Sequence, residues 1–281
     1  MHSTLFHIFS FPVPSYGTML ALAFLTGIFL AMYLAQKRGL NPDVISDLGL
    51  YVIIAAIVGA RAYYVMTHFG EFRGDLFSII NPVHDGQLGI SGLVMYGGFI
   101  AAIVTAVLFF RIKKLPALRY LDVCSPSVCI GIAITRIGCF LNGCCYGSAA
   151  KAGALISLSY PESSPAGYYQ SLVGAAGLQP SQFYESAGGL VMAALILLAG
   201  RSRWKFDGLQ FYMLVSLYAV MRFFIELTRV YVRSEMVGPF THNQVICIAL
   251  FAAFGGIIVK KIFWGSGKNI VKNTAAAKGK S

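Results

Sequence analysis

Seven apolar stretches, each about twenty residues long, constrain this chain more strongly than any other feature. They fall at 16–36, 48–69, 93–112, 121–140, 183–200, 208–227 and 243–264. Each is near the length that a helix needs to cross a hydrocarbon core about 30 Å thick. Only 12% of the residues are charged, whereas a soluble domain has about 25%. The sequence predicts an all-α membrane protein, with residues 1–264 forming a single domain of seven transmembrane helices.

The basic residues between these stretches predict how the helices are oriented. Fifteen of the 22 Lys and Arg residues follow the first, third, fifth and seventh stretches. The positive-inside rule therefore predicts an outer N-terminus and an inner C-terminus. Basic residues spread over short loops also argue against a nucleic acid partner. Residues 141–182 are long enough to form a cap on the outer face, and residues 265–281 are predicted to be a basic, disordered cytoplasmic tail.

Three arginines, Arg61, Arg136 and Arg222, lie inside these apolar stretches, 13 to 15 residues from the predicted inner ends. Charged side chains at membrane depth usually face a cavity and mark a substrate path. A guanidinium group binds phosphate through two hydrogen bonds and stays charged at any relevant pH. We therefore expect a shared anion site in the outer half of the membrane. The alternative is that each long side chain reaches the outer headgroups separately.

Acidic residues near these arginines are candidate counterions. Glu226 lies four residues after Arg222 and three before Arg229, so it can pair with either on one helical face. Glu185, at the start of the fifth stretch, is a second candidate. Asp122 is expected to cap the helix of the fourth stretch.

The most distinctive motif is residues 135–147, TRIGCFLNGCCYG. Its Asn142-Gly143 pair predicts a turn at the end of the fourth helix, and its glycines allow a close approach of the backbone to a ligand. Further short motifs occur in chain order: Tyr16-Gly17, Gly59-Ala60-Arg61, Tyr96-Gly97-Gly98-Phe99, the segment 180–185, the set Tyr218, Arg222, Glu226 and Arg229, and Asn243-Gln244. Together they resemble the motifs of bacterial prolipoprotein diacylglyceryl transferases, and the resemblance covers residues 16–260.

The resemblance implies a specific reaction and location. Members of that family transfer a diacylglyceryl group from phosphatidylglycerol to the lipobox cysteine of a prolipoprotein and release glycerol 1-phosphate. The reaction takes place at the outer face of the bacterial cytoplasmic membrane. We expect a monomer that needs no cofactor.

The roles expected for the site residues follow from this reaction. Arg136 and Arg222 are expected to stabilise the leaving phosphate, with Arg61 as a weaker third arginine. Tyr96 stands where the family usually has histidine, and it either positions the lipid or transfers a proton. The other residues expected to bind substrate are Tyr16, Gly97, Gly98, Asn142, Gln182, Tyr184, Glu185, Tyr218, Glu226, Arg229 and Gln244. For the neutral side chains, the alternative is a hydrogen bond between helices.

Three cysteines set this chain apart from the family pattern. Cys139 and Cys144 stand where the family usually has asparagine and glutamate, and Cys145 follows directly. Their position at the outer boundary allows a disulfide. Their spacing includes neither a C-x-x-C pair nor histidine, so no metal site is expected. Two other functions remain open: a non-catalytic lipid-binding relative, prompted by Tyr96 and Cys144, and a transporter of an anionic substrate.

Overall fold

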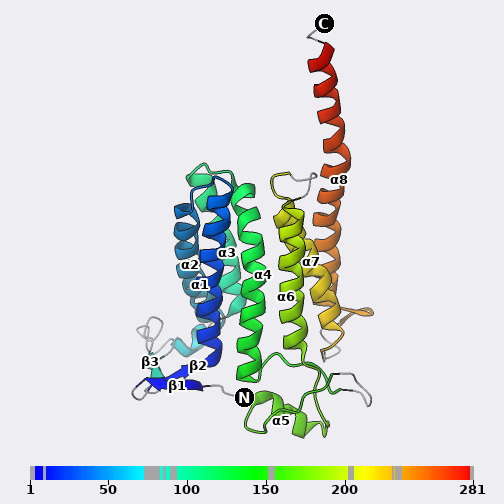
Figure 1. Cartoon of the computed structure of the whole chain (residues 1–281). Coiled ribbons are helices and arrows are strands. Elements are labelled where there is room, and N and C mark those ends of the chain that lie inside the picture. Colours follow the sequence, from blue (N-terminus) through cyan, green and yellow to red (C-terminus); the bar gives the residue numbers. More distant parts are fainter. Residues whose placement is uncertain are drawn as a thin grey trace. The chain divides into compact units, whose positions relative to one another are not determined.

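The seven predicted membrane spans are all present as helices in the computed structural model. It describes residues 4–8, 11–72, 83–84, 87–88, 94–150, 156–201, 206–229, 231 and 236–278. The long helices are α1 (Ser15–Lys37), α2 (Asp43–Thr67), α3 (Met95–Ile112), α4 (Ala117–Asn142), α6 (Ser181–Ala199), α7 (Leu209–Glu226) and α8 (His242–Lys278) (Figure 1). All seven are long and apolar enough to cross a membrane. The prediction of an all-α membrane protein is therefore confirmed.

The remaining elements are short. They are the helices η1 (Phe69–Phe72) and α5 (Pro165–Leu172) and the antiparallel pairs β1 (Thr4–Ile8) with β2 (Phe11–Pro14), β3 (Val83–His84) with β4 (Gln87–Leu88), and β5 (Met236–Val237) with β6 (Phe240–Thr241). Helix α5 lies in the segment predicted to form a cap. Nearby, Tyr160, Ala166 and Leu178 form a small apolar core with Phe140 of α4, which attaches this segment to the helix that carries Arg136.

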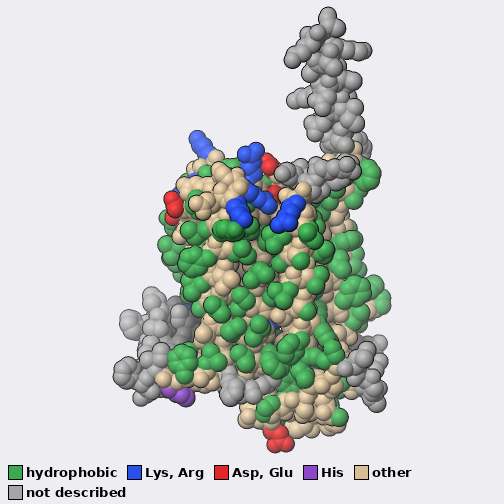
Figure 2. Space-filling view, in the orientation of Figure 1, with side chains coloured by type: hydrophobic (Ala, Val, Ile, Leu, Met, Phe, Trp, Pro, Cys, Tyr) green, Lys and Arg blue, Asp and Glu red, His purple; other side chains and the backbone are tan. Residues whose placement is uncertain are grey.

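The surface of the helices is apolar, as expected for contact with lipid. Hydrophobic side chains are spread over the helices on the face shown in Figure 2. Phe29 on α1, Leu198 on α6 and Phe224 on α7 are all exposed. Exposed apolar surface of this extent marks a membrane or partner contact rather than a surface that faces water. The protein is therefore a multi-pass membrane protein.

Helix α8 is the longest element and continues through Lys278. The disorder of residues 265–281 stays a prediction.

The chain divides into two compact units, Met32–Tyr120 and Met1–Ala31 with Leu121–Ser281, and the single domain expected for residues 1–264 stays a prediction. In the first, α2 and α3 pack against each other at glycines. A Cβ atom at Gly97 would collide with the Gly59 carbonyl oxygen and with Tyr63 Cβ, and one at Gly98 would lie 2.9 Å from the Ala56 carbonyl oxygen. Small residues of this kind let transmembrane helices approach closely, which gives Gly97 and Gly98 a role in packing.

In the second unit, Asp122 links two helices instead of capping its own. Its carboxylate lies on α4 and accepts hydrogen bonds from the backbone amides of Gly208 (2.8 Å) and Phe211 (3.0 Å) at the start of α7. The sequence suggested that Asp122 caps α4, and this was wrong. The free amides at the N-terminus of a helix need acceptors, and a carboxylate on the neighbouring helix supplies them.

Replacing Asp122 by alanine is expected to lower the free energy of unfolding by about 1–2 kcal/mol, because the start of α7 loses its capping acceptor. The measurement is unfolding of the purified protein by increasing SDS in mild detergent. Asp47→Ala is the control, because Asp47 forms an exposed ion pair with Lys113 that contributes little. Equal stabilities of the two variants would contradict the capping role.

Candidate functional site

Glu185 lies at the centre of a network of ion pairs. It sits near the start of α6, and its side chain is 0% exposed. Its Oε2 atom lies 2.5 Å from Arg136 Nη2 of α4. Its Oε1 atom lies 3.3 Å from Arg222 Nη1 of α7 and 3.0 Å from Arg229 Nη2, just beyond α7. One buried carboxylate therefore holds three guanidinium groups, as the sequence suggested for a counterion.

A second carboxylate completes this network, which we call the arginine cluster: Arg136, Glu185, Arg222, Glu226 and Arg229. Glu226 Oε1 lies 2.6 Å from Arg222 Nη2, one helical turn along α7. Three arginines and two glutamates give the cluster a formal charge of +1. The arginine side chains keep 16–21% of their surface exposed, so they remain partly accessible. A partly buried excess of positive charge favours an anion.

Two tyrosines named from the sequence lie close to the cluster. Tyr16 interacts electrostatically with Arg136 and with the thiols of Cys139 and Cys144. Helix α1 comes this close because position 138 of α4 is glycine: a Cβ atom there would lie 2.8 Å from Met19 Cβ. Tyr218 interacts electrostatically with Arg222, Glu185 and Arg136.

The end of α4 turns sharply at the Asn142-Gly143 pair. Gly143 has φ = +71°, a value that favours glycine. Its amide donates to the Phe140 carbonyl oxygen, and the Cys144 amide donates to the Cys139 carbonyl oxygen, both at 3.0 Å. These two bonds form a Schellman motif. The motif folds Cys144 back onto the last turn of α4, close to Cys139.

The loop after this turn is fixed by the start of α6. Ser181 Oγ donates to the Cys145 carbonyl oxygen, and Gln182 Nε2 donates to the Cys144 carbonyl oxygen, both at 2.8 Å. Gln182 is almost completely buried, and its Oε1 accepts from the Tyr160 hydroxyl. Gln182, a predicted substrate ligand, therefore holds the cysteine loop in place.

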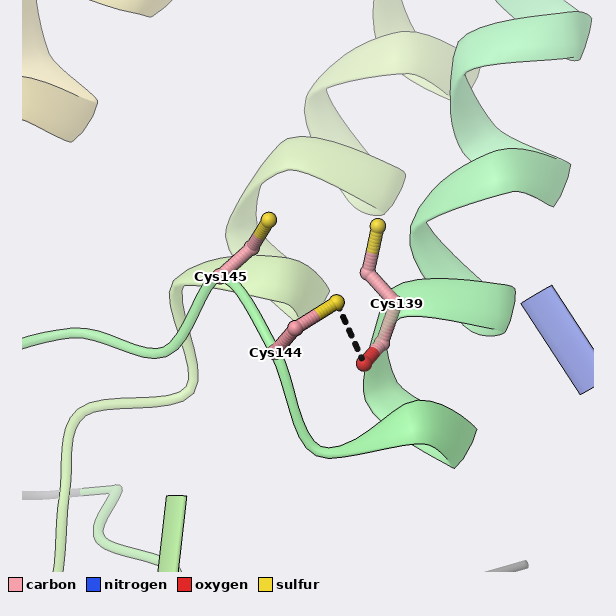
Figure 3. A group of neighbouring side chains, drawn as sticks. All are labelled: Cys139, Cys144 and Cys145. Atoms are coloured by element: carbon pink, nitrogen blue, oxygen red, sulfur yellow. Dashed lines mark hydrogen bonds between the residues drawn. The ribbon is translucent and has the colours of Figure 1, made fainter. Parts of the chain in front are cut away.

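The three cysteines of the signature converge at this loop. All six cysteines of the chain are free thiols, so the disulfide suggested from the sequence is not formed. The Sγ atoms of Cys139, Cys144 and Cys145 all lie within 4.8 Å of one another, with the Cys144 side chain pointing toward Cys139 (Figure 3). Cys144 Sγ donates to the Cys139 carbonyl oxygen at 3.6 Å. The neighbouring thiols of Cys139 and Cys144 lower the pKa of the Cys145 thiol below its ordinary value, and the charges of Arg136 and Arg229 lower it further, although burial opposes this shift.

Further residues named from the sequence lie near this loop or serve other contacts. Asn142 hydrogen-bonds the Cys144 thiol through its side chain, and Tyr184 is half-buried on α6. Gln244 forms a capping box with Thr241 at the start of α8: each side chain accepts from the other residue's amide, at 3.0 and 3.1 Å. The pattern Thr-x-x-Gln in the sequence was the signal for this structural role.

Four candidates, Arg61, Tyr96, Gly97 and Gly98, belong to the unit Met32–Tyr120. The residues of the arginine cluster belong to the other unit. Arg61 stacks on aromatic rings, with its guanidinium carbon 5.6 Å from the centre of Tyr64 and 5.3 Å from that of Phe72. Tyr96 is 66% exposed at the start of α3. Participation of these two residues in the same site stays a prediction.

Together, the fold and the site define a multi-pass membrane protein with a buried arginine–carboxylate network at the ends of its helices. The sequence model of the prolipoprotein diacylglyceryl transferase family matches residues 3–260. The chain belongs to this family.

Individual relatives support the same assignment, and each carries the name phosphatidylglycerol–prolipoprotein diacylglyceryl transferase. The protein from Finegoldia magna is 30% identical over 260 residues, which cover 92% of this chain and 95% of the relative. That from Listeria innocua is 32% identical over 250 residues, covering 89% and 86%. That from Nostoc sp. is 31% identical over 239 residues, covering 83% and 80%.

Proposed function

We propose that this protein transfers the diacylglyceryl group of phosphatidylglycerol to the lipobox cysteine thiol of a prolipoprotein, with release of glycerol 1-phosphate. Family membership over most of the chain supports the reaction. The single observation that carries the proposal is the arginine cluster, in which one buried carboxylate holds Arg136, Arg222 and Arg229.

The reaction requires stabilisation of a leaving phosphate. A carbon–oxygen bond of the lipid breaks, and the phosphate oxygen gains negative charge. Fixed positive groups stabilise this charge most when they need no rearrangement. Glu185 fixes Arg136 and Arg222 relative to each other, and their exposed edges would contact the phosphate.

The position of the cluster supports a reaction at the outer face of the cytoplasmic membrane. Arg136 lies near the end of α4, Glu185 near the start of α6 and Arg229 after α7, so all three occupy one end of these helices. Arg201 follows α6, and Lys260 and Lys261 lie near the end of the apolar span His242–Phe263 within α8, so these basic residues lie at the opposite end. The positive-inside rule assigns that end to the cytoplasm. In the variant Cys144→Ser/Cys145→Ser, a further change Glu162→Cys at an exposed position should add reaction with an impermeant maleimide in intact cells; protection would contradict this orientation.

Transfer itself tests the proposed function. Purified protein is incubated with phosphatidylglycerol and a lipobox peptide, and the peptide mass is measured. The account predicts a mass gain of one diacylglyceryl group, and no gain for a peptide with serine at the lipobox cysteine. Bound lipid without peptide modification would indicate a non-catalytic relative, and lipid or anion uptake into vesicles would indicate a transporter.

Tyr96→Phe is expected to keep most of the transfer activity, with a loss of a few-fold from a missing hydrogen bond of about 1 kcal/mol. The reason is that the exposed hydroxyl of Tyr96 at the start of α3 can donate a hydrogen bond to the lipid, which favours positioning. The measurement is kcat and KM for the peptide. A fall in kcat of about 10² or more would instead assign proton transfer to Tyr96.

A further inference from the structure

The feature that the phosphate chemistry leaves unused is the group of three thiols beside the arginine cluster. Cys139 lies in the last turn of α4, and Cys144 and Cys145 lie in the loop that folds back over it. Nothing in the transfer of a group between a lipid and an external thiol requires three further thiols at this point. The three thiols therefore need an explanation other than the binding of the lipid phosphate.

We propose that Cys139, Cys144 and Cys145 bind a zinc ion that keeps one coordination position open for the acceptor thiol. Zinc takes four ligands in a tetrahedron with zinc–sulfur distances of about 2.3 Å, which places neighbouring sulfurs about 3.8 Å apart. The three Sγ atoms already lie within 4.8 Å of one another, so small side-chain shifts suffice.

The backbone around the thiols is held in place before any metal binds. The Schellman bonds fix Cys144 against α4, and Ser181 and Gln182 hold the carbonyl oxygens of Cys145 and Cys144. Cys145 itself has φ = +60°, an uncommon value for a residue other than glycine. Strained backbone that the surroundings enforce is typical of functional sites.

The surroundings match a catalytic rather than a structural zinc site. Among the described residues, the group contains three cysteines and no histidine or carboxylate, which leaves the fourth position to an outside ligand, as in catalytic sites. Cys139 is buried, whereas Cys144 and Cys145 are partly exposed, so access remains from one side. Arg136 Nη1 donates to Cys139 Sγ at 3.7 Å, the kind of outer contact that orients a metal ligand.

The zinc would activate the acceptor, and this part of the inference rests on the proposed function. A thiol that coordinates zinc loses its proton, here to water. The lone pair of the resulting thiolate forms the new carbon–sulfur bond with the glyceryl carbon. The carbon–oxygen bond breaks, and its electron pair leaves with the phosphate oxygen, beside Arg136. No change of oxidation state is needed, which suits zinc.

Cobalt(II) replaces zinc as a spectroscopic probe in the first experiment. Full-length protein is reduced, treated with a chelator and titrated with cobalt(II) in detergent. We expect thiolate-to-cobalt charge-transfer bands that zinc abolishes, and a change in these bands when the lipobox peptide is added. A serine peptide should cause no change. Absence of the bands, or bands that the cysteine peptide leaves unchanged, would overturn the proposal without the use of any variant.

Variants and activity complete the test. The triple variant Cys139→Ser/Cys144→Ser/Cys145→Ser should lose the bands, whereas Cys124→Ala, elsewhere on α4, should keep them. Bands that persist in the triple variant would overturn the site. Chelation should lower the transfer rate at least about tenfold, and zinc should restore it. Full transfer by metal-free protein would overturn the zinc site and leave the proposed function standing. Failure of zinc-loaded protein to modify the peptide would overturn the proposed function and the activation step, while the cobalt bands would still support the metal site.

Discussion

Replacing Arg136 or Arg222 by alanine is expected to reduce kcat for diacylglyceryl transfer by at least about 10², or about 3 kcal/mol of transition-state stabilisation. Each arginine donates to Glu185 in the resting site and has an exposed edge for the phosphate. The charge on the phosphate grows only as the carbon–oxygen bond breaks, so the loss should appear in kcat. The measurement is the rate of peptide modification at saturating phosphatidylglycerol.

Two controls make this result specific. Lys113→Ala removes an exposed cation that pairs with Asp47 and should leave the rate unchanged. Arg136→Lys keeps the charge but loses the planar pair of donors, so its rate should fall between those of the wild type and the alanine variant. A normal rate for either alanine variant, in protein that is folded and inserted, would remove that arginine from the mechanism.

Replacing Glu185 by glutamine is expected to cost about 3 kcal/mol of unfolding free energy. Removing one partner of a buried ion pair typically costs about 3–5 kcal/mol, because the remaining charge loses its compensation. The value at the lower end applies here, because the three arginines retain some exposure and are partly screened. Unfolding of the purified variant by SDS, followed by circular dichroism, measures the change.

A double variant separates charge balance from lost packing. In Glu185→Gln with Arg229→Gln, one positive and one negative charge are removed together, so part of the stability should return. Non-additivity of this kind is expected for residues in one ion-pair network. If the double variant is destabilised by the sum of the two single changes, Glu185 does not act as the counterion of Arg229.

The membrane helices could be predicted from the sequence because length and hydropathy alone decide whether a segment crosses a bilayer. The pairing of Arg222 with Glu226 was also predictable, since residues four apart lie on one helical face. The depth of Arg136 and Arg222 predicted that they share an anion site, but not that both contact the carboxylate of Glu185. The sequence cannot show which faces of α4, α6 and α7 meet. Glu185 contacts both arginines because these three faces pack together.

Other features depend on contacts between distant segments. Asp122 caps α7 rather than α4 because a helix 86 residues away begins beside it. The spacing of Cys139, Cys144 and Cys145 suggested no metal site, because no C-x-x-C pair is present. The Schellman turn at Gly143 brings the three thiols together despite this spacing. The number and spacing of the cysteines do not predict the geometry of such a turn. Gln182 was predicted to bind substrate, but its side chain donates to the Cys144 carbonyl oxygen. The sequence does not show this partner, because every residue has a backbone carbonyl and only the fold decides which one lies near Gln182.

The most direct test of the central claim is an experimental structure of the protein with phosphatidylglycerol bound. The account predicts the lipid phosphate between Arg136 and Arg222, with guanidinium nitrogens about 2.7–2.9 Å from its oxygens and Glu185 still in contact with both arginines. A phosphate bound elsewhere, with both guanidinium groups engaged only by Glu185 and Glu226, would contradict it.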